Sequence, residues 1–333
     1  MSSNTDVQIF PASQTCLPTE LVEIIISYAW SIPMYARDRI KLFASFSLVS
    51  RSWFSMLIRT VLRDVHIQCP LSANDYLDFI RERKTPRTDK FRWMQDTSLI
   101  ANDLCRSLTF HVEHDAHRTS ADVHQSVMLR SAGDVSANAI STAMYMISTR
   151  KYLPNLRCVS INYVNWGFDD IFERGRFLFF PDQVTHLDIT FAFGNAFLEA
   201  LGRTLRDHHR RHWREGFKAP SVRHLSIFGA PATFVSEMLA RCPEVEALDT
   251  DDVECLTQLL ALPRKLNTLI LYPHQKKLDR VEMIKRVFGK AHGVGNLGRL
   301  CENMELLEHC GRSEAMSREK ERCCEPRGLL QAS

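Results

Sequence analysis

Histidines are the residues of this sequence whose type and spacing come nearest to metal chemistry. His111, His114 and His117 recur every third residue, and His208 and His212 have the i, i+4 spacing that places two imidazoles on one side of a helix. Asp115 stands beside the first group, but a zinc site also needs ligands held by a turn or by facing elements, and nothing in the sequence fixes that geometry. No carboxylate motif accompanies the second group. We therefore interpret the first group as exposed loop histidines and the second as part of a solvated helix face. The sequence predicts no metal site.

The ten cysteines do not favour a metal or a disulfide framework either. They show no C-x-x-C motif and no regular spacing, and stand at positions 16, 69, 105, 158, 242, 255, 301, 310, 323 and 324. The group formed by Cys301, His309, Cys310, Cys323 and Cys324 has a spacing unlike that of zinc modules. Several cysteines lie within apolar runs, where a free thiol packs as a small hydrophobe. We predict reduced core thiols.

Catalytic motifs are missing from the sequence. The string Gly293-x-Gly295-x-x-Gly298 matches the dinucleotide fingerprint. It does not follow a strand that opens a βαβ unit, however, and no acidic residue on a second strand stands about 20 residues further on. We interpret it as a loop. Phosphate-binding glycine loops, G-x-S-x-G and H-E-x-x-H do not occur. We expect a protein that is not an enzyme and holds no cofactor.

The composition indicates a soluble globular protein of about two domains. Of the 333 residues, 45% are hydrophobic and 24% are charged, and the formal net charge is +3. So small a charge gives no reason to expect a membrane or nucleic-acid partner. The basic, histidine-rich run Arg203–Arg214 leaves a site for phosphate, an acidic partner or nucleic acid as an open alternative.

The start of the chain predicts an intracellular protein. Residues 1–13 have neither the basic n-region nor the apolar run of a secretory signal. No stretch approaches the roughly 18 apolar residues that a membrane span needs, and the densest one, Leu21–Trp30, contains Glu23. We expect a cytoplasmic and/or nuclear location.

Three helical patterns follow one another between Leu17 and about Asp64. In the first, Pro18 and Glu20 suit a helix start, and apolar residues then recur at helical spacing at Leu17, Leu21, Ile24, Ile25 and Tyr28. The second pattern runs from about Asp38, a plausible N-cap, to Val49. The third starts near Ser50.

These helices carry more apolar surface than they can cover among themselves. The second helix has two apolar stripes, Ile40/Phe43/Ala44/Leu48 and Leu42/Phe46/Val49, and the first has a surplus in Val22, Ile26, Ala29 and Trp30. A unit of about fifty residues buries only about 60% of its surface. The remainder must be covered by the rest of this chain or by a partner.

A repeat follows the helices. The template apolar-x-x-apolar-x-apolar occurs after a proline five times, at Leu156/Val159/Ile161, Val184/Leu187/Ile189, Val222/Leu225/Ile227, Val245/Leu248/Thr250 and Leu266/Leu269/Leu271. The starts differ by 28, 38, 23 and 21 residues, and three of these intervals fall within the 20–29 residues of leucine-rich repeats. Two further matches begin at Leu62 and Cys105. Helical patterns lie between them at about 136–151, 195–213, 232–241, 252–262 and 279–289. The alternation predicts an α/β fold built as a curved solenoid.

Residues 16–65 resemble the F-box. The opening Leu17-Pro18-Thr19-Glu20-Leu21 and the later Ser47-Leu48-Val49-Ser50-Arg51-Ser52-Trp53 are similar to the first and last segments of that motif. The remainder resembles the divergent leucine-rich-repeat-like bodies of fungal F-box proteins. The resemblance implies four segments: a disordered N-terminus (1–15), the F-box (16–65), a repeat body (66–310) and a disordered tail (311–333).

What the resemblance implies is function by binding. An F-box binds the Skp-type adaptor, and through it the cullin, of an SCF-type cullin-RING ubiquitin ligase, while the body holds a protein substrate. By position in the motif, the resemblance implies that the residues in contact with the adaptor are Leu17, Pro18, Leu21, Ile25, Leu48, Val49 and Trp53. The alternative is a leucine-rich-repeat-like scaffold that binds a protein partner outside any ubiquitin ligase.

Strand residues between the buried ones are candidates for substrate contact. In a solenoid they face the concave side, and we select Asp188, Phe228, Asp249 and Tyr272 from them. Leucine-rich repeats also carry a ladder of Asn or Cys three residues past the last strand leucine. Here those positions hold Val164, Ala192, Ala230, Val253 and His274, so we expect an irregular solenoid.

Overall fold

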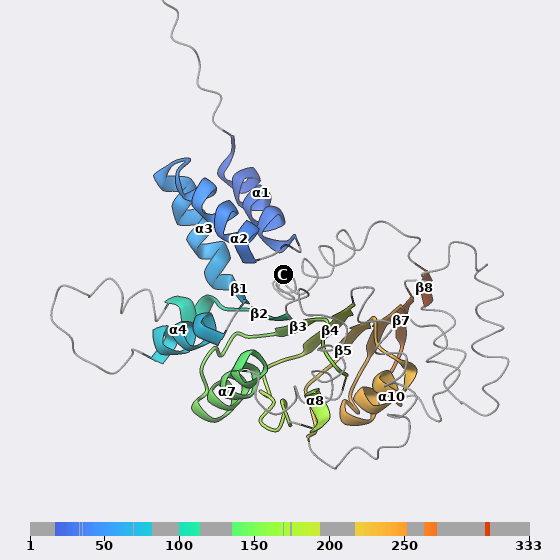
Figure 1. Cartoon of the computed structure of the whole chain (residues 1–333). Coiled ribbons are helices and arrows are strands. Elements are labelled where there is room, and N and C mark those ends of the chain that lie inside the picture. The colour runs from blue at the N-terminus through green and yellow to red at the C-terminus, as the bar shows by residue number, and fades with distance from the viewer. Residues whose placement is uncertain are drawn as a thin grey trace, which may run out of the picture. The chain divides into compact units, whose positions relative to one another are not determined.

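The computed structural model describes residues 17–32, 34, 36–68, 70–81, 100–113, 135–168, 170–173, 175–193, 217–251, 263–271 and 304–306. The chain divides into two compact units, Met1–Thr60 and Val61–Ser333, which we call the N-terminal unit and the sheet unit (Figure 1). Several predictions lie outside the described residues: both disordered ends, the helices at 195–213, 252–262 and 279–289, the basic run Arg203–Arg214, the glycines at 293–298, and Tyr272.

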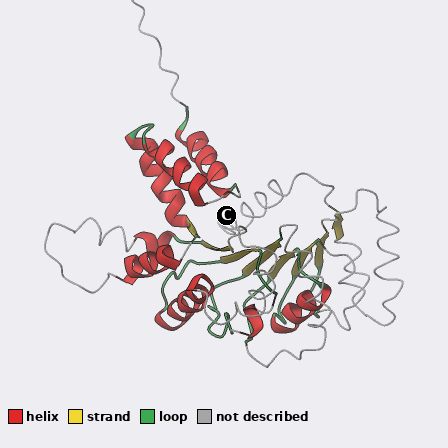
Figure 2. Ribbon diagram, viewed as in Figure 1, coloured by secondary structure: helices red, strands yellow, loops and turns green. Residues whose placement is uncertain are grey.

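The N-terminal unit consists of the three predicted helices (Figure 2). They are α1 (Thr19–Ser31), α2 (Ala36–Ser47) and α3 (Arg51–Arg63), the last of which continues into the sheet unit. Pro18 takes the N-cap of α1, where its missing amide hydrogen costs nothing. Asp38 is not the N-cap that we predicted, because α2 begins two residues earlier and places Asp38 in its first turn.

The sheet unit has the mixed α/β character that we predicted, and it is built around one parallel sheet. Eight strands lie side by side in chain order, namely β1 (Asp64–Ile67), β2 (Ser107–Glu113), β3 (Cys158–Val164), β4 (His186–Ala192), β5 (His224–Phe228), β6 (Ala247–Thr250), β7 (Thr268–Leu271) and β8 (Met304–Leu306). All seven template matches coincide with β1 to β7. We did not predict β8, although Cys301/Met304/Leu306 fits the same template without a proline.

The proline of each repeat belongs to a turn that leads into the strand. In all five cases the first apolar residue of the template donates its amide hydrogen to the carbonyl oxygen three residues earlier, at 3.0–3.3 Å. The acceptors are Leu153, Pro181, Ala219, Cys242 and Pro263. Pro154, Pro220 and Pro243 take the second position of their turns, which the fixed φ of proline suits, whereas Pro181 and Pro263 take the first position and supply the acceptor carbonyl. The shared proline of the sequence repeat therefore marks a repeated turn.

Helices of the sheet unit lie on one side of the sheet in Figure 1: α4 (Pro70–Arg81), α7 (Val135–Arg150), α8 (Asp170–Glu173) and α10 (Ala232–Arg241). The predicted helices at 136–151 and 232–241 are thus confirmed. The first of the four was not predicted, although Ala73, Leu77 and Ile80 are spaced as a helix face and are buried. Helix α8 has only four residues, so its sequence is too short to show the spacing of apolar residues that indicates a helix.

The core lies on one face of the sheet. Two rows of apolar side chains cross the strands in register, Leu108–Val159–Leu187–Leu225–Leu248–Leu269 and Phe110–Ile161–Ile189–Ile227, and all of them are buried. Because side chains alternate along a strand, the residues between them project from the other face. We call that other face the polar face.

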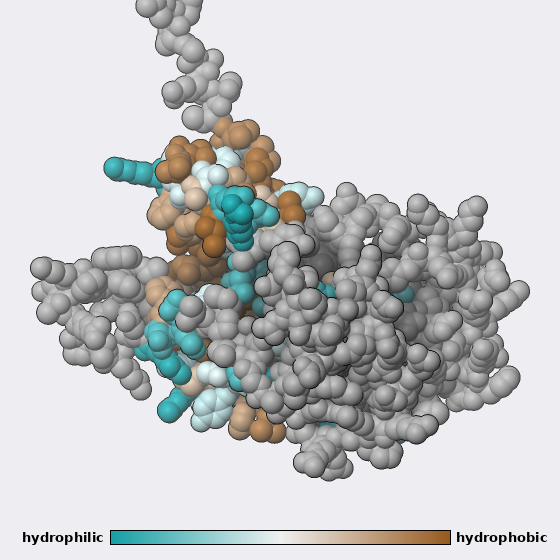
Figure 3. Space-filling view, in the orientation of Figure 1, coloured by the Kyte–Doolittle hydropathy of each residue, from teal (hydrophilic) through white to brown (hydrophobic). Residues whose placement is uncertain are grey.

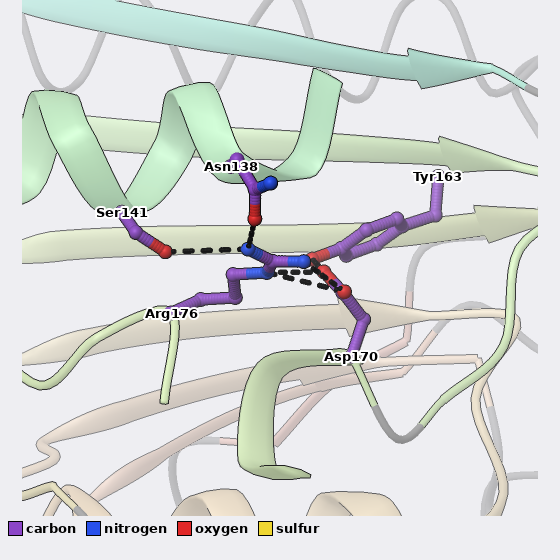
Figure 4. Close-up of polar contacts among 5 residues, drawn as sticks. All are labelled: Asn138, Ser141, Tyr163, Asp170 and Arg176. Carbon is purple, nitrogen blue, oxygen red and sulfur yellow. Dashed lines mark hydrogen bonds and ion pairs between the residues drawn. The ribbon is translucent and has the colours of Figure 1, made fainter. Parts of the chain in front are cut away.

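A buried polar network joins the helical layer to the sheet (Figure 4). The guanidinium of Arg176 donates to Asp170 through Nη2 at 2.7 Å and to Asn138 Oδ1 through Nη1 at 2.7 Å. Tyr163 of β3 donates its hydroxyl hydrogen to Asp170 Oδ2 at 3.0 Å. The Arg176 and Asp170 side chains are both buried, and each charge has an opposite charge and further hydrogen bonds around it. Such a network fixes the turn after α8 against α7 and β3.

Candidate protein-interaction surfaces

Helix α1 has apolar residues on two opposite sides, and only one side is buried. Val22, Ile26 and Trp30 form the buried side. The side chains of Leu17, Leu21, Ile24, Ile25 and Tyr28 are exposed. The sequence showed both stripes but not their roles: we treated Val22, Ile26 and Trp30 as the surplus, and the structure buries them.

Helix α2 buries fewer apolar side chains than α1 or α3 where the structure describes them. Among its described side chains only that of Arg39 is buried, whereas Ile40 is exposed and Leu42, Phe43 and Phe46 are half-buried. A short helix gains most of its stability from packing of its apolar face. The apolar stripes predicted for α2 are therefore covered only in part within this chain.

Arg39 holds α2 against the end of α1. Its guanidinium donates to the carbonyl oxygens of Trp30 and Ile32, the second at 3.2 Å, and lies 4.9 Å from the centre of the Trp30 ring. These carbonyls are at the C-terminal end of α1, where helical partners are lacking. Burial lowers the pKa of Arg39 to about 10, so the guanidinium stays charged at neutral pH. The sequence contained no signal for this role.

The turn between α2 and α3 presents two of the predicted contact residues. Leu48 and Val49 follow the last residue of α2, and Leu48 is 85% exposed. Their amides donate to the carbonyls of Ser45 and Phe46, both at 3.3 Å. Ser50 then caps α3 by accepting the amide hydrogen of Trp53 on its Oγ at 3.2 Å. A well-formed turn thus directs two apolar side chains outward.

Trp53 differs from the other predicted contact residues because it is half-buried. Its ring packs edge-on against that of Phe46, with 5.5 Å between the centroids. The pair joins α2 to α3, so Trp53 has a packing role in this unit. Pro18, like Leu17 and Leu21, is exposed.

Exposed apolar side chains are concentrated in the N-terminal unit. Of the thirteen large hydrophobic residues that are exposed in the described part of the chain, nine lie between Leu17 and Phe54. Figure 3 shows brown, apolar residues gathered over α1–α3 on the face in view. Isolated exposed hydrophobes need no explanation, but a contiguous set marks an interaction surface. We call these nine residues the apolar surface: Leu17, Leu21, Ile24, Ile25, Tyr28, Ile40, Leu48, Val49 and Phe54.

The polar face of the sheet holds the predicted substrate residues that the structure describes. Asp188 and Phe228 are half-buried, and Asp249 is fully buried. Asp188 Oδ2 accepts hydrogen bonds from Ser160 at 2.8 Å and from the Cys158 thiol at 3.3 Å. Asp249 Oδ2 pairs with His224 Nε2 at 3.0 Å and accepts from Ser226 at 3.3 Å. Asp249 is thus an interior residue and not the surface contact that we expected.

Histidines also line the polar face. His111 lies in β2, where its ring stacks on that of His66 with Nε2 3.2 Å from Nδ1 of that residue, so our interpretation of it as a loop residue was wrong. The rings of His186 and His224 are neighbours as well, with centroids 5.2 Å apart. In the described part of the chain no three His, Cys, Asp or Glu side chains are placed to share a metal ion.

No protein-family model matches this chain, and no curated protein matches it. Within the described residues no helix has the length and apolar character needed to cross a membrane.

Cys105, Cys158 and Cys242 are buried free thiols, as expected for core cysteines.

Proposed function

We propose that this protein is a substrate receptor of an SCF-type ubiquitin ligase, whose N-terminal unit is an F-box that binds a Skp-type adaptor. The observation that carries the proposal is the apolar surface on α1–α3. Its members include five of the seven contact positions implied by the motif, namely Leu17, Leu21, Ile25, Leu48 and Val49. Of the other two, Pro18 is exposed and Trp53 is half-buried. Motif resemblance and side-chain exposure in the structure therefore select largely the same positions.

The energetics of the apolar surface support a stable complex. Each side chain that passes from full exposure to full burial gains about 1.5–3 kcal/mol. Several such side chains offset the translational and ordering costs of association, which amount to about 4–15 kcal/mol. The turn residues Leu48 and Val49 are already held by backbone hydrogen bonds, which reduces the ordering cost.

We propose further that the sheet unit is an irregular leucine-rich-repeat-like solenoid that holds the substrate. Support comes from the chain-order parallel strands and from the turn repeated before five of them. The mechanism is recruitment: the complex raises the effective concentration of a bound protein beside the ubiquitin-charged enzyme, and this chain performs no chemistry.

An affinity pull-down with a purified Skp-type adaptor tests the proposal. Wild-type protein is expected to be recovered, and the variant with Leu17, Pro18 and Leu21 all changed to alanine is not. Leu178→Ala is the matched control, because Leu178 is 58% exposed but lies in the sheet unit. Equal recovery of wild type and the triple variant would count against the proposed contact surface, and failure to recover the wild type would favour the alternative, a scaffold that acts outside a ubiquitin ligase.

A further inference from the structure

Arginine recurs at one position of the repeat, directly before the strand. Arg63, Arg106, Arg157 and Arg223 precede β1, β2, β3 and β5 in this way. Backbone hydrogen bonds align these positions across the sheet: the amide of Arg157 donates to the carbonyl oxygen of Arg106 at 2.8 Å, and the amide of Arg106 donates to that of Arg63 at 2.9 Å. Neighbouring positions are therefore about 4.8 Å apart, as the strands of one sheet are. We call these four residues the arginine row.

The outer two arginines of the row are paired with carboxylates of the chain itself. Arg63 Nε lies 3.4 Å from Asp64 Oδ2, and Arg223 Nη1 lies 2.5 Å from Glu246 Oε1. The position before β4 holds the uncharged Thr185, whose amide donates to the carbonyl oxygen of the preceding position at 2.9 Å. The charge of the row is thus balanced at both of its ends.

The inner two arginines have no carboxylate partner in the part of the chain that the structure describes. Arg106 is exposed, and no hydrogen bond or ion pair engages its guanidinium there. Arg157 is half-buried, and its Nη1 donates to backbone carbonyl oxygens of two turns at 3.1–3.4 Å. These bonds hold the Arg157 guanidinium at the edge of the sheet, but they do not balance its charge. Two neighbouring positive charges are therefore left for a ligand.

The turns around these two arginines add to the positive charge and are tied to one another. Asn102 Oδ1 accepts the amide hydrogen of Leu153 at 3.2 Å, and Asn155 donates its side-chain hydrogen to the carbonyl oxygen of Asp103 at 2.8 Å. The turns that lead into β2, β3 and β4 are residues 101–106, 150–157 and 181–185. Their basic side chains are Arg106, Arg150, Lys151 and Arg157, and their acidic ones are Asp103 and Asp182. This edge of the sheet thus presents an excess of positive charge on a preorganised backbone.

We propose that the edge around Arg106 and Arg157 binds a short acidic segment of the recruited protein. Each guanidinium takes one carboxylate through its two parallel N–H donors. Side chains on one side of an extended segment recur about every 7 Å, which two arginine side chains rooted about 4.8 Å apart can reach. Nucleic acid is a poorer fit, because a polyanion pairs with many cations and this row is already neutralised at Asp64 and Glu246. The inference rests on the proposed recruitment function and names the class of segment that the sheet unit selects.

Fluorescence anisotropy with two short labelled peptides tests this inference, using the full chain without the adaptor at low ionic strength, where charges are least screened. One peptide alternates glutamate with serine, and the other alternates glutamine with serine. The glutamate peptide is expected to bind and the glutamine peptide is not. Arg106→Gln should weaken binding of the glutamate peptide about threefold to fivefold, as loss of an exposed ion pair requires. Arg106→Lys keeps the charge and should retain most of the affinity.

Arg223→Gln is the matched control, because it removes an arginine of the same row that already has a carboxylate partner. Unchanged affinity in this variant supports the site, whereas an equal loss at both arginines, or no binding of the glutamate peptide, would overturn it. A labelled single-stranded oligonucleotide that binds more tightly than the glutamate peptide, and is weakened by Arg106→Gln, would overturn the assignment to a protein segment.

Adaptor recovery is measured separately on the same proteins, so that the two proposals can fail independently. A wild type that binds the glutamate peptide but not the adaptor contradicts only the proposed function. A wild type that binds the adaptor but not the peptide contradicts only this inference.

Discussion

At Gly229 the backbone leaves no room for a side chain. Its φ is +68°, and a Cβ built there would lie 2.2 Å from the carbonyl oxygen of Phe191 on the neighbouring strand. Its amide hydrogen is shared by the two carboxylate oxygens of Asp251, both at 2.9 Å. The position thus fixes the end of β5 between β4 and β6.

Gly229→Ala should therefore destabilise the sheet unit by about 2–4 kcal/mol, through a backbone clash added to the left-handed strain. Urea unfolding measures the loss. Gly175→Ala is the control: its φ is also positive, at +58°, but its nearest new contact is an ordinary 3.9 Å. That variant should lose only about 1 kcal/mol, and equal losses at both glycines would contradict the close approach.

The Arg176–Asp170 pair leads to a second prediction at this scale. Arg176→Met leaves the Asp170 carboxylate buried without its cation and should cost about 3–5 kcal/mol. Thermal unfolding measures this loss. Changing Asp170→Leu in the same molecule should restore part of the stability, because two apolar side chains need no partner. Asp182→Asn, at the exposed pair with Lys151, should change stability by less than about 0.5 kcal/mol. A double variant no more stable than Arg176→Met would argue against the buried charge as the cause.

Burial of Cys242 makes stability depend on alkaline pH. Desolvation raises the pKa of this thiol from 9.0 to about 12, so the folded state keeps the proton that the unfolded state loses. The contribution to stability is present in full below pH 9 and is lost as the pH rises from about 9 towards 12. At pH 10 the thiol should account for about 1 kcal/mol of lost stability. Cys242→Ala should therefore lose about that much less than wild type between pH 8 and pH 10 in chemical unfolding; identical losses would contradict the assignment.

At the scale of elements, substitutions on the two sides of α1 should separate effects on folding from effects on binding. Ile26→Ala removes a fully buried side chain and should cost about 2–5 kcal/mol of stability. Ile24→Ala, two residues away and 60% exposed, should change stability by less than about 0.5 kcal/mol while weakening adaptor binding. Thermal unfolding and adaptor affinity, measured on both variants, check this. A large loss of stability in Ile24→Ala would show that the exposed stripe is part of the fold.

The sequence predicted the fold best where a repeated apolar spacing and a turn-forming proline occurred together. Apolar spacing with a preceding proline was enough to place β3 to β7, because the proline indicates the turn and the apolar spacing independently indicates the strand. It could not decide which stripe of α1 faces inward, since Leu21 and Ile24 are as apolar as Val22 and Ile26. Burial of Asp249 was equally hidden, because an aspartate between buried strand residues is usually solvated.

At the scale of the whole molecule, the two units contain different kinds of surface. The N-terminal unit carries nine of the thirteen large exposed hydrophobes of the described chain, and the sheet unit has a polar face whose strands lack basic residues. An exposed apolar surface suits a lasting complex with one partner. The proposed adaptor binding requires such a concentration of exposed apolar side chains in one unit.

The adaptor affinity of the purified full chain tests the central claim most directly. In a calorimetric titration with a Skp-type adaptor, wild type should bind tightly and show the negative heat-capacity change of apolar burial. A variant carrying Leu21→Ala and Leu48→Ala should bind at least about tenfold more weakly, and Leu178→Ala should bind as wild type does. An absence of binding by wild type, or an equal affinity in the double variant, would contradict the account.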